Sequence, residues 1–100
     1  MIMIAGKIRL DPAKQEQATR AAVAMTEASR AEPGCVDYAF TWDLLEPGVL
    51  RVIEQWQDQD ALDLHFKAPP MATFTAAMGD LGVTEMDVTK YEIAKAGPVF

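Results

Sequence analysis

The sequence contains little cysteine, little histidine and few basic residues. Its single cysteine, Cys35, cannot form an intrachain disulfide, so nothing indicates an oxidising compartment. One histidine and one cysteine cannot supply a conventional zinc site. Nine basic residues stand against fifteen acidic ones, and the net charge of −6 argues against binding to nucleic acid or to an anionic membrane surface.

Long apolar runs and nucleotide-binding motifs are absent as well. No apolar stretch approaches the roughly 20 residues of a membrane span, and the segment from Met1 to Lys7 lacks the basic region of a signal peptide. We therefore expect a cytoplasmic protein. There is no phosphate-binding loop, no G-x-S-x-G nucleophile elbow and no dinucleotide fingerprint after a strand, which excludes the common forms of nucleotide-dependent and serine-hydrolase chemistry.

Apolar side chains are abundant and make up 50% of the 100 residues. This length suits one domain over residues 1–100. A domain of that size buries only roughly 60–65% of the surface that its unfolded chain exposes. The surplus of apolar side chains over core volume predicts an apolar surface that is shared with a partner.

The spacing of apolar residues predicts the element order β-α-β-β-α-β. Asp11-Pro12 is typical of a helix start, and Glu32-Pro33-Gly34 of a helix end. Asp58 or Asp60 caps a second helical segment, which Pro69-Pro70 divides in two. Alternating apolar and polar residues predict four strands, at residues 2–10, 35–45, 49–57 and 83–94. This order predicts an α+β, ferredoxin-like fold, in which helices cover one face of an antiparallel sheet.

Two local features of the predicted sheet can be specified further. Glu46-Pro47-Gly48 predicts a tight turn between the second and third strands, and if the strands flank it directly, Tyr38 lies opposite Trp56. Gly6 interrupts a row of isoleucines in the first strand. It indicates either a β-bulge or the close approach of a backbone or ligand, and the bulge is the simpler interpretation.

Each strand of the predicted hairpin carries apolar residues on both faces. Helices can cover only one face of the sheet, so the other face must be covered by something else. We expect a second copy of the chain to cover it, giving a homodimer in which two sheets close into a dimeric α+β barrel.

Two segments resemble a known family. The segment from Glu32 to Tyr38 matches an E-P-G-C-x-x-Y motif that precedes a hairpin, and the segment from Glu54 to Phe66 matches an E-x-W-x5-h-x-x-H motif. In order and spacing, the chain is similar over essentially its whole length to the antibiotic biosynthesis monooxygenase family. The resemblance implies a small oxygenase that acts on quinols or polyketide anthrones without a cofactor, in a superfamily that also includes other activities.

The sequence departs from the haem-degrading branch of this fold. That branch uses an asparagine late in the first strand and a histidine on the last helix, whereas this chain has Gly6-Lys7 there and no histidine between Met71 and Leu81. Without an imidazole the expected iron ligand is missing. Because the resemblance also implies cofactor-independent chemistry, we expect neither a metal nor an organic cofactor.

His65 is the candidate catalytic residue. Histidine is the side chain that exchanges protons most readily near neutral pH. On a helix His65 shares a side with Ala61 and Leu62, so it is expected to point toward the sheet. It can serve as a general base or donate a hydrogen bond to a substrate oxygen. A half-buried histidine that is bonded to a backbone carbonyl is the structural alternative.

Aromatic side chains are the candidate substrate-binding residues. Trp56 and Tyr38 can present flat surfaces and polar tips to an aromatic ligand, or can simply pack in the core. Glu54 is expected in mid-strand, where a carboxylate either has a partner such as Arg51 or serves as a buried acid-base group. The residues that can wall the same cavity, or lie in the core or an interface instead, include Phe40, Phe66 and Phe74.

The resemblance implies a cofactor-independent monooxygenase that oxidises a small hydroquinone or anthrone-like compound with O2, and these residues are compatible with it. Such a protein must bind a flat apolar molecule, remove a phenolic proton and exclude water, and His65, Trp56 and Tyr38 meet these needs. Two alternatives stay open, namely an isomerase or lyase of a small carbonyl compound on the same scaffold, and a non-catalytic dimeric module that binds a ligand.

Overall fold

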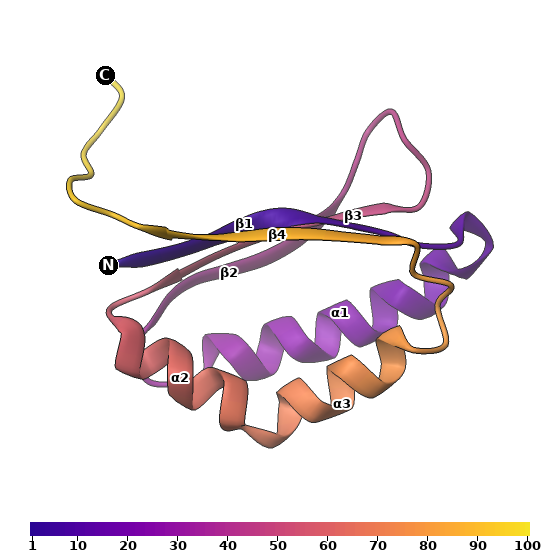
Figure 1. Cartoon of the computed structure of the whole chain (residues 1–100), viewed down its shortest axis with the longest axis horizontal. Coiled ribbons are helices and arrows are strands. Elements are labelled where there is room, and N and C mark those ends of the chain that lie inside the picture. Colours follow the sequence, from indigo (N-terminus) through magenta and orange to yellow (C-terminus); the bar gives the residue numbers. More distant parts are fainter.

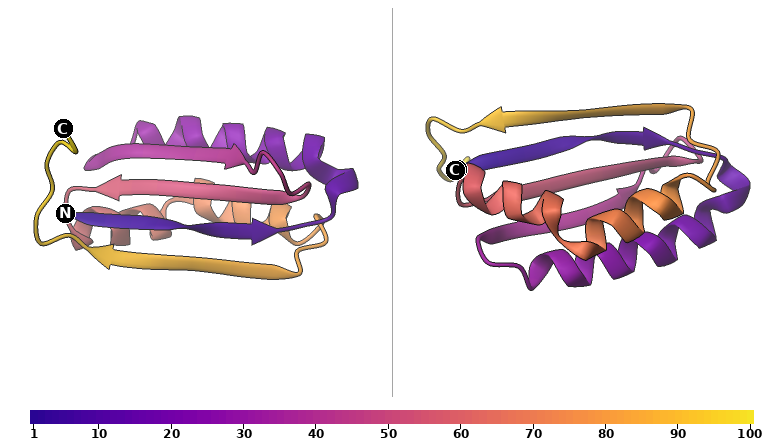
Figure 2. Two further views of the ribbon diagram at one scale, coloured as in Figure 1. Left: turned by 90° about the horizontal axis from the view of Figure 1, so that it is seen from above. Right: turned by 60° about the horizontal axis from the view of Figure 1, so that its bottom comes forward.

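The computed structural model describes residues 1–100 and contains four strands and three α-helices. The elements are β1 (Ile2–Arg9), a short 3-10 helix η1 (Pro12–Lys14), α1 (Gln15–Arg30), β2 (Cys35–Trp42), β3 (Val49–Trp56), α2 (Gln59–Lys67), α3 (Pro69–Met78) and β4 (Glu85–Glu92). All strand pairs are antiparallel, in the order β2-β3-β1-β4, and Figure 2 shows them side by side in its left view. The predicted α+β, ferredoxin-like fold is confirmed.

All helices lie on one face of the sheet, which Figure 1 shows above them. Every second residue of the central strands points to this inner face, because side chains alternate along a strand. The small side chains of Ala18 and Ala22 on α1 are buried there and let the helix lie close to the sheet. The larger buried side chains of this layer are Ile2, Ile4, Ile8, Leu50, Val52, Trp56, Met25 and Leu62.

One row of side chains across the inner face is mostly polar. Tyr38 on β2 pairs with Glu54 on β3. Ile4 on β1 lies between Glu54 on one side and Lys90 on β4 on the other. Because paired residues point to the same face of a sheet, this row presents a phenol, a carboxyl, an aliphatic group and an ammonium to the space below the sheet.

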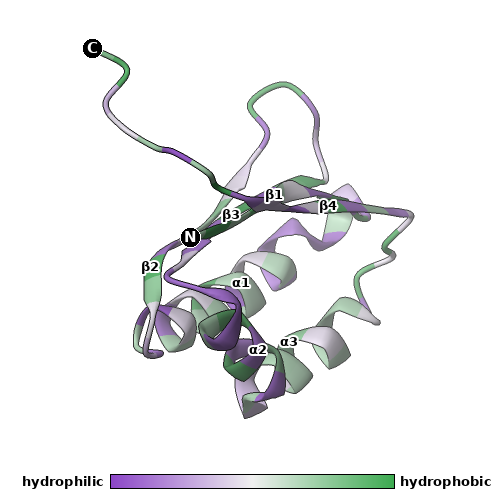
Figure 3. Cartoon of the chain, turned by 60° about the vertical axis from the view of Figure 1, so that its left-hand side comes forward, coloured by the Kyte–Doolittle hydropathy of each residue, from purple (hydrophilic) through white to green (hydrophobic).

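The outer face of the sheet is covered by no other element of the chain (Figure 1). Ile53 and Tyr91 remain 41% and 47% exposed on it. Figure 3 shows further hydrophobic residues at the tip of the loop between β2 and β3. The apolar residues of the outer face form what we call the outer patch, made of Met3, Ala5, Ala39, Ile53 and Tyr91.

The hairpin of β2 and β3 differs from its predicted register. β2 ends at Trp42 and not at residue 45, because the Asp43 carboxylate accepts hydrogen bonds from two backbone N–H groups of the loop, both at 2.9 Å, and turns the chain. The longer loop pairs Tyr38 with Glu54 and not with Trp56. The shift is two residues, so the same side chains keep the inner face.

Gly6 marks a close approach of two strands, and the predicted bulge there is wrong. Pairing is continuous through Gly6 on both sides of β1. A Cβ at this position would collide with the backbone of Asp87 and lie 2.5 Å from the Cα of Val88. The irregularity of the sheet lies in β2 instead, between Cys35 and Asp37.

The second helical segment is divided as the sequence predicts. Asp58 caps α2, because its carboxylate accepts a hydrogen bond from the N–H of Ala61 at 2.9 Å. The backbone is extended at Ala68, and α3 begins with Pro69. The right view of Figure 2 shows α2 and α3 as separate helices with different directions. Neither these helices nor α1 combine the length and apolar character that crossing a membrane requires.

Candidate active site

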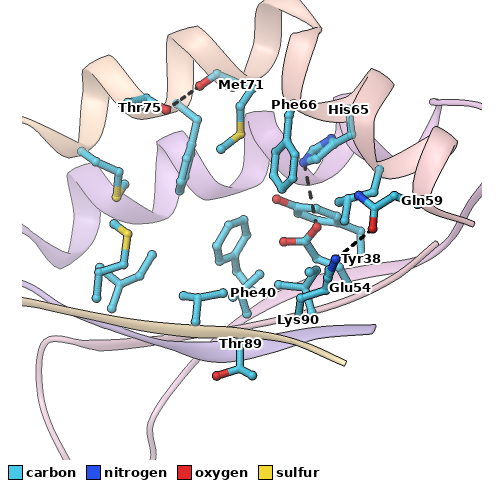
Figure 4. Close-up of a pocket in the computed structure, with 18 residues that line it drawn as sticks. Tyr38, Phe40, Glu54, Gln59, His65, Phe66, Met71, Thr75, Thr89 and Lys90 are labelled. Carbon is cyan, nitrogen blue, oxygen red and sulfur yellow. Dashed lines mark hydrogen bonds and ion pairs between the residues drawn. The ribbon is translucent and has the colours of Figure 1, made fainter. Parts of the chain in front are cut away.

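A cavity of about 460 Å³ lies between the inner face of the sheet and helices α2 and α3 (Figure 4). Twelve of its eighteen lining residues are hydrophobic, and its volume suits a small organic molecule. Met86 and Val88 line it from β4 and remain 61% and 41% exposed, so the cavity opens toward this edge strand.

Glu32, in the turn after α1, holds the side chain of His65. Nδ1 of His65 and Oε1 of Glu32 are 2.6 Å apart, and the His65 side chain is only 2% exposed. Because a carboxylate accepts hydrogen bonds and cannot donate them, Nδ1 carries the hydrogen, and in the neutral ring Nε2 is the acceptor. Nε2 is 3.9 Å from Oε1 of Glu54, as the dashed line in Figure 4 marks.

Glu54 is a buried acid without a lysine or arginine partner. Its Oε1 accepts a hydrogen bond from Nε1 of Trp56 at 2.9 Å. Burial raises the pKa of Glu54, and the Trp56 hydrogen bond and the nearby His65 oppose that rise without cancelling it. Arg51, the partner that the sequence suggests, is bonded to Asp43 at 3.0 Å instead. Arg51 cannot reach Glu54 because the two side chains lie on opposite faces of β3.

Tyr38 adds a neutral phenol beside these groups. Its ring centroid lies 5.6 Å from that of His65, and its side chain is buried. Burial, together with the charge of Glu54, raises the pKa of Tyr38 well above its ordinary value. The phenol therefore keeps its proton and stays a hydrogen-bond donor.

Phenylalanine side chains form the apolar wall of the cavity. Phe40 on β2 and Phe74 on α3 stack with ring centroids 5.3 Å apart and planes at 30°. Phe66 on α2 lies next to His65, with centroids 5.6 Å apart. Such surfaces bind flat aromatic molecules through stacked and edge-to-face contacts.

The structure places the predicted site residues in two groups. The first group lines the cavity and consists of His65, Tyr38, Phe40, Phe66 and Phe74. Trp56 is fully buried and does not line the cavity, which differs from the expectation that its ring faces a ligand. It is the last residue of β3, where α2 closes over the sheet, and its ring lies 4.6 Å from the His65 ring.

Three polar residues near the cavity are missing from the residues that the sequence singles out. From the sequence alone, Glu32 is interpreted as part of a helix end and not as a site residue. It is nevertheless the first residue of the motif that contains Tyr38. Gln59 and Lys90 line the cavity at its polar end. The alternation of β4 could have found Lys90, because it shares a face with Met86 and Val88.

The model of the antibiotic biosynthesis monooxygenase family matches residues 1–77. The chain belongs to this family. The resemblance carried by the two sequence motifs is therefore confirmed.

Individual relatives of this antibiotic biosynthesis monooxygenase family member are similar to it over nearly the whole chain. An uncharacterised protein of Synechocystis is 34% identical over 94% of the chain, which spans 64% of that relative's length. YcnE of Bacillus subtilis is 26% identical over 95% of the chain and 100% of YcnE. One solved structure is that of a putative antibiotic biosynthesis monooxygenase from Deinococcus radiodurans. It is 26% identical to this chain with a TM-score of 0.92, and the match covers 100% of this chain and 99% of the Deinococcus chain.

The site of this family member is suited to proton transfer next to a flat apolar ligand. A histidine oriented by a carboxylate is the arrangement of a general base. A second carboxyl with a raised pKa beside it can hold or return a proton. No group of three or more His, Cys, Asp or Glu side chains is arranged to hold a metal ion.

Proposed function

We propose that the protein is a cofactor-independent monooxygenase that oxidises a small hydroquinone or anthrone-like compound with O2. The observation that carries the proposal is the orientation of His65, whose Nδ1 is bonded to Glu32 at 2.6 Å and whose Nε2 is left free on the side of Glu54. His65 thus acts as the catalytic base in a cavity walled by aromatic rings. Membership of the antibiotic biosynthesis monooxygenase family supports the reaction class.

The reaction begins when Nε2 of His65 takes the proton of a phenolic O–H. The electron-rich anion passes one electron to O2, and the two radicals combine to form a carbon–oxygen bond and a peroxide. The O–O bond then breaks as the same carbon loses its hydrogen, which releases water. In sum, a hydroquinone and O2 give a hydroxyquinone and water, so that no external reductant is needed.

The other residues of the cavity support this sequence of steps. Glu54 holds a proton beside His65 and returns it to the peroxide as the O–O bond breaks. Tyr38 donates a hydrogen bond to an oxygen of the substrate, and Trp56 keeps Glu54 in place. Phe40, Phe66 and Phe74 bind the ring of the substrate and exclude water from the oxygenated intermediate.

We also propose that the protein is a cytoplasmic homodimer. The outer patch supports the dimer, because the chain itself leaves these apolar residues uncovered. A partner sheet that packs on the outer patch would complete a dimeric α+β barrel. The single cysteine, Cys35, which cannot form an intrachain disulfide, supports the location.

A second candidate function is an isomerase or lyase of a small carbonyl compound. The 3.9 Å separation of His65 Nε2 and Glu54 Oε1 favours it, because enolisation needs a base and an acid on one ligand. Such an enzyme would convert its substrate without consuming O2.

The decisive experiment measures oxygen consumption and product formation by purified, metal-stripped protein with a panel of quinols and anthrones. His65→Ala should lower turnover roughly 10²–10⁴-fold on any true substrate, with fold and oligomeric state kept. Trp56→Phe is the companion variant, because it keeps an aromatic ring and removes the N–H donor to Glu54. Normal oxygenation by both variants would remove the proposed site, and substrate conversion without oxygen uptake would favour the second candidate.

A further inference from the structure

One end of the cavity carries a positive charge that proton transfer does not use. Lys90 is the only lysine or arginine among the eighteen lining residues. Its Nζ donates a hydrogen bond to Oε1 of Gln59 at 3.0 Å, which joins β4 to the start of α2 across the cavity. Figure 4 shows both side chains beside Glu54 and His65, whereas Thr89 points away to the other side of the strands.

The position of Lys90 relative to the proton-transfer groups is fixed by the register of the sheet. Ile4 separates Glu54 from Lys90 in one cross-strand row, so their Cα atoms are two strand spacings, roughly 10 Å, apart. The side chain between them is aliphatic. A ligand ring that lies over Ile4 therefore has Glu54 on the β3 side and Lys90 on the β4 side.

Two neighbours contact the ammonium of Lys90. The amide of Gln59 is oriented by Asp63, which accepts a hydrogen bond from its Nε2 at 2.9 Å, so that its oxygen faces Lys90. Glu92 lies 3.8 Å from Nζ, but it is 77% exposed and leaves the charge of Lys90 only weakly compensated. The Lys90 side chain itself is 44% exposed, so a ligand can reach it.

We infer that Lys90 recognises a carboxylate on the substrate, which makes the substrate class a carboxylated hydroquinone or a similar phenolic acid. This inference rests on the proposed function for the position of the phenolic group and adds the chemistry of the side of the cavity that lies near β4. A single ammonium matches one carboxylate charge. A phosphate dianion would need further cations, and the lining provides none.

The test measures binding and not turnover. Isothermal titration calorimetry under anaerobic conditions compares gentisate (2,5-dihydroxybenzoate), its methyl ester and 4-hydroxyphenyl phosphate on the full chain. Wild-type protein should bind gentisate about 5- to 20-fold more tightly than the ester, as expected for a partly exposed charged hydrogen bond. Lys90→Gln should abolish this preference and Lys90→Arg should restore most of it. Lys67→Gln, the matched control, should keep it, because Lys67 does not line the cavity.

Several outcomes would overturn the inference. They are equal affinity for acid and ester, no measurable binding of gentisate, or an acid preference that survives in Lys90→Gln. Tighter binding of the phosphate ester than of gentisate would overturn the assignment to carboxylates. Oxygen uptake is measured separately on the same samples. An acid preference that depends on Lys90, in protein that consumes no O2, would uphold this inference and contradict the proposed function.

Discussion

Replacing Glu32 by glutamine removes the negative charge beside His65 and keeps an oxygen that can accept the Nδ1 hydrogen. The two groups are 2.6 Å apart, with His65 2% and Glu32 18% exposed, so solvent screens the contact little. A hydrogen bond to a charged group contributes about 1.5–3 kcal/mol. Proton transfer to Nε2 creates an imidazolium, which needs the charge of Glu32 more than the neutral ring does. Each ~1.4 kcal/mol changes a rate tenfold, so kcat should fall roughly 10- to 150-fold.

The assay for Glu32→Gln uses an oxygen electrode with the substrate that the panel identifies, and it separates kcat from KM. KM should change little, because Glu32 does not line the cavity. Thermal unfolding of the same sample should show a loss of only about 1 kcal/mol, since an acceptor oxygen remains. Glu16→Gln is the matched control, because Glu16 pairs only with Arg20 on the exposed side of α1.

Unchanged kcat in Glu32→Gln, accompanied by a clear loss of thermal stability, would refute this reasoning. Glu32 would then support the fold at the end of α1 without acting on the charge of His65. A rise in KM with constant kcat would also contradict it, because that pattern means lost substrate binding and not a less effective base.

Three further predictions concern the core, the sheet and the assembly. Burial raises the pKa of Glu54 above the ordinary 4.5. The protonated side chain therefore contributes stability that is present below pH 4.5 and is lost as the pH rises through the pKa of the folded state. Glu54→Gln should flatten a plot of Tm against pH in that range. Gly6→Ala should lower the free energy of unfolding by about 1–3 kcal/mol in urea denaturation, because the added methyl meets the β4 backbone. Ile53→Lys in the outer patch should shift the protein from dimer to monomer in sedimentation velocity, whereas an unchanged dimer would place the interface elsewhere.

Local patterns were sufficient to predict the elements of this fold. Asp11-Pro12, the cap at Asp58 and the break at Pro69 are signals within a few residues, and each appears where the sequence indicates. The hairpin register was predicted wrongly because it depends on how the loop folds. Asp43 ends β2 by bonding the loop backbone, and nothing in the alternation of apolar residues reveals that contact.

In the candidate site too, nearby sequence predicts individual residues, whereas contacts between residues far apart in the chain are not predicted. The sequence identifies His65 as the only histidine and predicts that it lies on the side of a helix that faces the sheet. The structure places it at the cavity. Its carboxylate partner could not be identified, because Glu32 is 33 residues away and meets it only after α1 and α2 pack on the sheet. Likewise, Gly6 was ambiguous because the strand that comes close to it, β4, is the last one in the chain.

Because the backbone is extended at Ala68, the two helical walls of the cavity belong to two separate helices, α2 and α3. The proposed base, His65, is on α2, whereas Phe74 and Met78 are on α3, beyond a residue with extended backbone. Substitutions on α3 can therefore change the size and shape of the space offered to a ligand while the hydrogen bond between His65 and Glu32 stays in place. A scaffold built in this way can acquire new substrates through α3 without rebuilding its proton-transfer chemistry.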